Sequence, residues 1–153
     1  MTVDWIVVGR AAEPGPDGSV SILGAGVHTF FCQPLAAPPQ PPAAGTRVPV
    51  GTPINFVVVV RCLVSRTELG RLQPVTIRVS DQDGHSVLPL NPEFPVVPPN
   101  NPLIPPGGHI PINLLSAFNN FMPPTWGQYA IDVLINNDLK GTATFQVHPA
   151  QQA

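Results

Sequence analysis

At 153 residues the chain has the length of one domain, and it can bury a core without help from a metal ion or a disulfide bond. Only 10% of the residues are charged, 22 are proline, and the formal net charge is −2. The absence of a basic excess argues against nucleic-acid binding through phosphate contacts. No apolar stretch is long enough to span a bilayer. We therefore expect one cytoplasmic domain over residues 1–153, with no membrane or nucleic-acid partner.

The N-terminal part is predicted to consist of short strands. Residues 3–12 alternate as a strand does, and their apolar run ends after four residues, too soon for a secretory signal. Residues 14–18 are rich in turn-forming Pro, Gly and Asp, so residues 19–23 are expected to pair back on the first strand. The Gly24-Ala25-Gly26 stretch lacks the helix start of a phosphate-binding loop. A further strand is predicted for residues 27–32.

Residues 33–53 contain seven prolines and cannot form a helix or a central strand. The favoured interpretation is an extended connection that wraps around the domain. The alternative is a proline-rich ligand for an aromatic groove on a partner. Its candidate partner-binding residues are Pro38, Pro39, Pro41 and Pro42.

The next strand is predicted over residues 54–63, where both faces are apolar. Val57 and Val59 lie on one face, and the opposite face carries Phe56, Val58, Val60 and Cys62. Two apolar faces indicate either a central strand or a strand whose outer face meets a partner. Val57 and Val59 are therefore also candidate partner-binding residues.

A hairpin is predicted around Asp83-Gly84, a dipeptide typical of two-residue loops. Residues 75–80 would form its first arm, with Val79 opposite Leu88 and Ile77 opposite Leu90. Between the strand at 54–63 and the first arm of this hairpin, residues 65–72 are expected to form a loose turn.

Four elements are expected before the last hairpin. They are a short edge strand at 93–97, a second proline-rich loop at 98–108, a strand at 109–115 and one helical turn at 116–122. Pro111 places the 109–115 strand at a sheet edge, because proline cannot donate to a central ladder.

The strongest pattern is a hairpin over residues 126–147. A three-residue loop at 136–138 would set Ile135 opposite Leu139, Ile131 opposite Ala143 and Tyr129 opposite Phe145. A loop shorter by one residue would turn one arm's apolar face outward, so burial favours the odd loop. Tyr129 has two interpretations, a hydroxyl that bonds to the preceding corner or an aromatic ring in a cross-strand pair.

Few residues suggest chemistry. Asp81, Asp83 and His85 resemble the start of a calcium loop, but the downstream bidentate Glu is missing, and a plain turn explains them better. The four histidines are scattered, and no nucleophile motif is present. We expect no enzyme activity, no catalytic residues and no cofactor. Cys32 and Cys62 are expected to be buried thiols, as is usual in a reducing compartment.

The order of these features resembles an uncharacterised family, a domain of unknown function, of small bacterial proteins with an immunoglobulin-like β-sandwich. The matching motifs are Val3-Asp4-Trp5, Asp17-Gly18, Ile22 to Gly26, Asp81 to Gly84, Gly127 to Tyr129 and Phe145 to Val147. The resemblance implies a fold and no activity. The usage of Ala, Pro, Gly and Val with a single Lys is typical of a high-GC, actinobacterial source.

The combined prediction is an all-β chain, an immunoglobulin-like antiparallel sandwich of about eight or nine strands with long proline-rich loops. The expected function is a non-enzymatic protein-interaction or assembly module, acting as an accessory subunit of a larger complex. A protein partner or a homo-oligomer is expected. The alternative is a small-ligand or metal-binding domain that uses the 81–85 loop.

Overall fold

The computed structural model describes residues 1–36, 47–88, 93–96, 98, 104–105 and 107–151. This part of the chain is all β apart from one turn of 3-10 helix, η1 (Arg66–Glu68). Its ten strands are β1 (Thr2–Gly9), β2 (Ala11–Pro14), β3 (Val20–Leu23), β4 (Thr29–Cys32), β5 (Ile54–Ser65), β6 (Gln73–Asp81), β7 (Glu93–Val96), β8 (His109–Phe121), β9 (Gly127–Ile135) and β10 (Asp138–Pro149).

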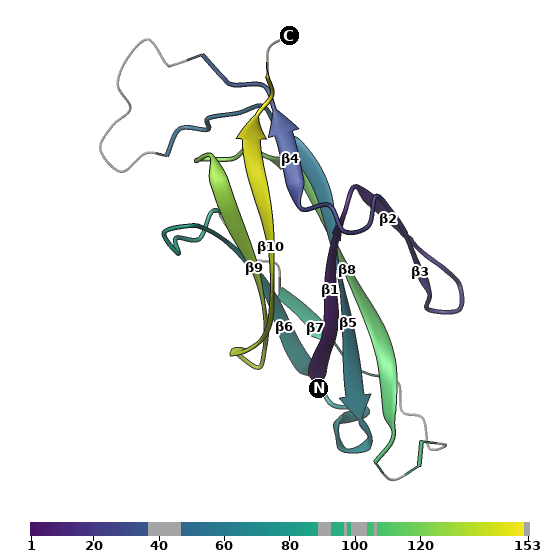
Figure 1. The fold of residues 1–153 in the computed structure, drawn as a ribbon. Coiled ribbons are helices and arrows are strands. Elements are labelled where there is room, and N and C mark those ends of the chain that lie inside the picture. The colour runs from purple at the N-terminus through teal and green to yellow at the C-terminus, as the bar shows by residue number, and fades with distance from the viewer. Residues whose placement is uncertain (37–46, 89–92, 97, 99–103, 106, 152–153) are drawn as a thin grey trace.

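The strands form three sheets, in the orders β1-β5-β8, β4-β10-β9-β6-β7 and β2-β3. Figure 1 shows the two larger sheets facing each other, with the β2–β3 ribbon on the far side of the three-stranded sheet. All pairings among the described strands are antiparallel except that of β4 with β10. The arrangement is that of a β-sandwich with an added two-stranded ribbon.

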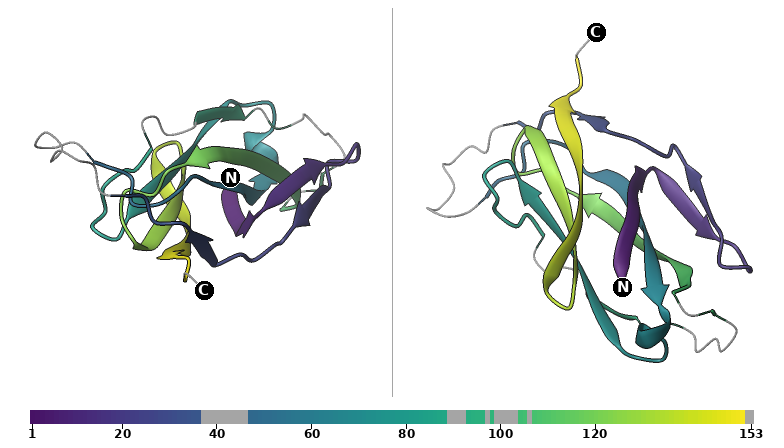
Figure 2. Two further views of the ribbon diagram at one scale, coloured as in Figure 1. Left: turned by 90° about the horizontal axis from the view of Figure 1, so that it is seen from above. Right: turned by 60° about the horizontal axis from the view of Figure 1, so that its bottom comes forward.

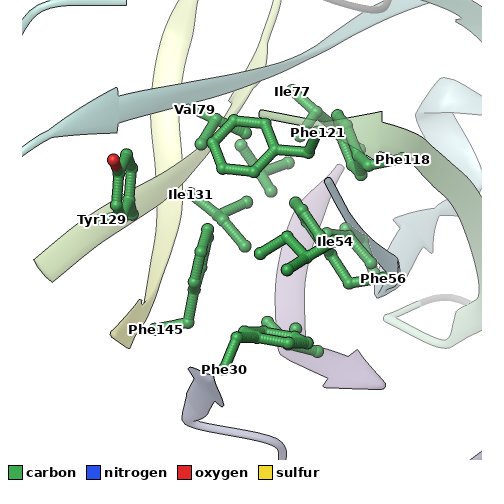
Figure 3. Packing of buried hydrophobic residues seen from close by; sticks show 14 of the residues in the cluster. Phe30, Ile54, Phe56, Ile77, Val79, Phe118, Phe121, Tyr129, Ile131 and Phe145 are labelled. Carbon is green, nitrogen blue, oxygen red and sulfur yellow. The ribbon is translucent and has the colours of Figure 1, made fainter. Parts of the chain in front are cut away.

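The core lies between the two larger sheets, where aromatic rings from both layers meet (Figure 3). Phe56 of β5 stacks on Phe118 of β8 with ring centroids 4.8 Å apart. In the facing sheet Tyr129 stacks on Phe145 at 5.2 Å, and Phe121 meets Tyr129 edge-on at 5.6 Å. These contacts join the sheets because alternate side chains of each strand point inward.

The C-terminal hairpin keeps the predicted register in its body, where Tyr129 pairs with Phe145 and Ile131 with Ala143. The predicted loop is wrong. Asn136 and Asn137 alone form the turn, with φ of 53° and 65°, and Ile135 pairs with Asp138 rather than with Leu139. A register shift between Leu139 and Gly141 supplies the odd residue. A two-residue turn followed by a bulge therefore turns the same side chains inward as a three-residue loop would.

The N-terminal strand predicted over residues 3–12 is interrupted at Arg10. β1 pairs with β5, whereas β2 leaves that sheet and pairs with β3 alone. Residues 19–23 were predicted to pair with the first strand, and this is confirmed for β2 but not for β1. Figure 2 shows the resulting ribbon reaching away from the end of β1.

In the middle of the chain the predicted turn is correct, and the predicted strand pairing that follows it is wrong. The Asp83-Gly84 turn forms, and Ser80 and Ser86 make an isolated bridge after it. The Val87 N–H donates to the Val79 carbonyl at 3.0 Å, so the predicted pairing of Val79 with Leu88 is wrong by one residue. Residues 85–88 form no strand, and β6 takes β7 as its neighbour instead. The predicted partner Leu90 lies outside the described residues.

Two further predictions concern the segments around β8. The helical turn expected at 116–122 is wrong, because β8 continues to Phe121 and places Phe118 and Phe121 in the core. The edge position of the strand that contains Pro111 is confirmed, since β8 pairs with β5 alone among the described strands. In the proline-rich segment 33–53, the described residues show one isolated bridge, between Pro34 and Gly51.

Candidate protein-interaction surfaces

The Asp81–His85 turn is organised around one buried carboxylate. Oδ1 of Asp81 accepts from the backbone N–H groups of Asp83 at 3.1 Å and His85 at 2.9 Å. Oδ2 accepts from Nη1 of Arg47 at 3.0 Å. Burial raises the pKa of Asp81, but the His85 N–H, the Arg47 charge and the Asp83 N–H together outweigh it, so the net pKa is lowered.

The three candidate metal ligands do come together. Ligand atoms of Asp81, Asp83 and His85 lie within 4.8 Å of one another, with Asp81 buried and the other two exposed. Both oxygens of Asp81 are already occupied by donors, and a metal ion would have to compete with them. The geometry is that of a carboxylate closing its own turn, an Asx-type arrangement.

Val57 and Val59, the candidate partner-binding residues on β5, are covered by the chain itself. Their side chains are 7% and 0% exposed, yet neither belongs to the core cluster between the two large sheets. The β2–β3 ribbon lies over this outer face. A Cβ atom at Gly9, which pairs with Val57, would lie 2.5 Å from Cγ2 of Ile22.

The far end of the ribbon is anchored as well, because Nδ2 of Asn113 on β8 donates to the Gly18 carbonyl at 2.8 Å. The ribbon therefore runs across the outer face from Gly9, which pairs with Val57, to Asn113, which pairs with Arg61. Val59 lies between these two positions on β5. In this conformation a partner does not reach Val57 or Val59. The other candidates, Pro38, Pro39, Pro41 and Pro42, lie outside the described residues.

Phe31 on β4 is an exposed aromatic side chain that the sequence analysis did not single out. Its neighbours Phe30 and Cys32 point into the core, so alternation turns Phe31 outward, where it is 66% exposed. The ring of His148 on β10 lies beside it, with centroids 6.1 Å apart. The signal was present in the sequence as two adjacent phenylalanines in one strand, which cannot both be buried on one face.

A hollow of about 290 Å³ lies beside Phe31 and is lined by Arg10, Phe30, Phe31, Ile54 and Asn55. Arg10 makes no ion pair within the described part of the chain. Its aliphatic stem lies against Gly24, where a Cβ atom would be 3.2 Å from Arg10 Cγ. The lining is therefore mixed, with the apolar side chains of Phe30, Phe31 and Ile54 beside the polar Asn55 and the Arg10 cation.

The two cysteines are free and buried, Cys32 on β4 and Cys62 on β5. Burial raises the pKa of both thiols, that of Cys62 to about 11. Such thiols are poor nucleophiles near neutral pH, because the thiolate is the reactive form. The prediction of buried, unbridged cysteines is confirmed.

A family model matches residues 44–148, and its description is a family of unknown function, DUF6941. The chain belongs to this family. The matched range contains β5 to β9 and β10 up to His148, so the Asp81 turn and the C-terminal hairpin lie within it. β1, the β2–β3 ribbon and β4 precede it. The predicted resemblance to an uncharacterised family is confirmed.

No curated protein and no solved structure matches the chain. Among the described residues, no helix has the length and apolar character needed to cross a membrane.

Proposed function

We propose that the chain is a non-enzymatic protein-interaction module that serves as an accessory subunit of a larger assembly, with an immunoglobulin-like sandwich as its scaffold. Two features support that scaffold. The hydroxyl of Tyr129 donates to the carbonyl of Thr125, four residues upstream, as in the tyrosine corner of immunoglobulin-like domains. The β10-β9-β6-β7 order, with Tyr129 near the start of the second of these strands, supports the same assignment.

The observation that carries the binding function is the exposure of Phe31 beside the hollow that contains Arg10. Among the Phe, Tyr and Trp side chains that the structure describes, Phe31 is the exposed one. Leaving a phenylalanine in water forgoes about 1.5–3 kcal/mol of burial free energy. Aromatic and arginine side chains beside a pocket are also the residue types that dominate binding energy at interfaces.

The partner is a protein segment whose chemistry follows from the lining. An apolar side chain of the partner would fill the hollow against Phe30 and Ile54, and a carboxylate next to it would pair with Arg10. Asn55 would supply one further polar contact. The partner segment therefore carries an apolar side chain that enters the hollow and an acidic residue next to it.

The test is affinity capture from a lysate of the source organism, followed by mass spectrometry and calorimetry with the purified partner. Phe31→Ala should weaken binding about tenfold or more, as expected of an aromatic hot spot. Arg10→Ala should weaken it and reduce its dependence on salt. Leu139→Ala is the matched control, since Leu139 is 57% exposed at the distant tip of the β9–β10 hairpin. A partner bound equally well by all three variants would contradict the proposal, as would capture of no protein.

The clustering of Asp81, Asp83 and His85 favours a second candidate, metal binding by the 81–85 loop. Calorimetric titration with Ca²⁺ and Zn²⁺ decides between the two. We expect no heat of binding, because the Asp81 oxygens are held by Arg47 and two backbone N–H groups. Heat that disappears in Asp83→Asn would favour the metal site.

A further inference from the structure

The free edge of β8 is the longest edge in the described part of the sandwich. β8 spans 13 residues and pairs on one side with β5, and no described strand lies on its other side. Such an edge presents unpaired backbone groups that can add a further strand. The other edges of the two large sheets are protected: β4 and β7 have four residues each, β7 contains Pro95, and β1 carries Asp4 and a register shift.

The two ends of β8 are blocked, and its centre is open. Pro111 lacks an N–H, and Asn120 has a φ of 59° and donates its N–H to Oδ1 of Asn55. Between these residues the stretch 112–119 contains no charged residue and no proline. Charges and prolines are the usual means by which proteins prevent edge pairing, and the centre of β8 lacks both.

The direction of the backbone groups follows from Pro111. Proline in a sheet places its nitrogen on the unpaired side, so the peptide groups of residue 111 face away from β5. The ladder from His109 to Phe118 runs without a register shift, and alternation then turns the peptide groups of Asn113, Leu115 and Ala117 to the same free edge. Asn113 and Ala117 lie two residues before and two residues after Leu115, so the three open positions are symmetric about Leu115.

The side chains at this edge are incompletely buried on both faces of the sheet. Ile112 and Leu114 on the core side, and Leu115 on the outer side, are half-buried, whereas Val58, Val59 and Val60 of the adjacent β5 are 0% exposed. A strand placed next to β8 would complete the cover of these aliphatic groups. The apolar and hydrogen-bonding requirements of the edge therefore point to the same occupant, an uncharged strand.

We propose that the occupant is β8 of a second copy of this chain, paired antiparallel about a two-fold axis at Leu115. The two-fold axis sets Leu115 opposite its own counterpart and Asn113 opposite Ala117 of the other copy. Self-pairing requires that no like charges meet, and the uncharged stretch 112–119 satisfies this condition. The two three-stranded sheets then form one six-stranded sheet. This inference extends the proposed assembly function and does not use the Phe31 surface.

The test uses the purified full-length chain, in sedimentation equilibrium over a wide range of protein concentration. The wild type should form dimers. Leu115→Lys and Leu115→Glu should each associate about tenfold or more weakly, because like charges meet across the axis and the leucine burial is lost. An equimolar mixture of the two variants should restore a heterodimer. Thr144→Lys on the exposed outer face of β10 is the control and should dimerise as the wild type does.

An independent measurement covers the case in which a charge at position 115 prevents folding, which circular dichroism would reveal. Leu115→Cys should form an intermolecular disulfide under mild oxidation, and Thr144→Cys should not. A monomeric wild type at all concentrations would overturn the proposal, as would a dimer that both charge variants leave intact. Because no lysate partner is involved, failure here leaves the Phe31 test unaffected, and the reverse also holds.

Discussion

The hydroxyl of Tyr129 donates to the carbonyl oxygen of Thr125 at 2.5 Å and accepts from the Thr125 N–H at 3.1 Å. One phenol therefore satisfies both backbone groups of the corner that precedes β9. Its ring is fully buried and stacks on Phe145. The two interpretations of Tyr129, corner bond and cross-strand aromatic pair, are both correct, because ring and hydroxyl serve at opposite ends of the side chain.

Replacement of Tyr129 by Phe keeps the stacked ring and removes the hydroxyl. The Thr125 backbone groups then lose their partner, and we expect the free energy of unfolding in urea to fall by about 1–2 kcal/mol with an unchanged m value. Thr125→Ser is the control, because the backbone bonds remain. A loss below a few tenths of a kcal/mol would show that water replaces the hydroxyl at this corner.

Replacement of Gly9 by Ala tests whether the β2–β3 ribbon lies on the outer face of the three-stranded sheet. The new Cβ would lie 2.5 Å from Cγ2 of Ile22, so the Ile22 side chain or the ribbon that carries it must shift. We expect faster hydrogen exchange at residues 20–23 and a loss of about 1–3 kcal/mol in stability.

The matched experiment is a double-mutant cycle with Ile22→Ala, which removes the atom that clashes. The double variant should be less destabilised than the sum of the two single variants, since the residues are in contact. Additive effects would contradict the packing of the ribbon on Gly9.

Asp81 makes stability depend on pH in a direction that can be predicted. Its pKa is lowered in the folded protein below the ordinary value of 3.8, so its stabilising contribution is present above that value. The contribution is lost as the pH falls through the folded pKa. We expect Asp81→Asn to be about 1–3 kcal/mol less stable than the wild type at pH 7, because the charged partner of Arg47 is gone.

Urea denaturation of Asp81→Asn and the wild type should converge as the pH drops below 3.8. Asp83→Asn is the control, since Asp83 is exposed and is expected to change stability little at any pH. A difference at Asp81 that stays constant with pH would argue against the Arg47 and backbone N–H bonds as its source.

The raised pKa of Cys62, about 11, predicts a thiol that does not react in the native state. Ellman's reagent at pH 8 should label neither Cys62 nor Cys32 in folded protein, and both thiols after unfolding in urea. Labelling at the global unfolding rate would fit this expectation. Fast labelling of native protein would mean that the sandwich opens locally at β4 or β5.

Much of this fold was determined by the sequence alone, wherever the controlling interactions are local. Alternation along residues 128–135 and 143–147 specifies which side chains face inward, and so Tyr129 pairs with Phe145 as predicted. Asn136 and Asn137 tolerate positive φ, so residue type indicated a turn at this point, although the predicted loop was one residue too long. The bulge at Lys140 could not be predicted from the sequence, because a bulge and a longer loop satisfy the same burial pattern.

The tertiary structure alone decided what covers the apolar outer face of β5 and which edges stay open. Val57 and Val59 have the pattern of a two-sided strand, and the sequence could not say whether a partner or the chain itself covers them. The break at Arg10, which sends β2 out of the first sheet, answers this question. Such contacts join residues far apart in the chain, and their energies depend on packing that no local pattern records.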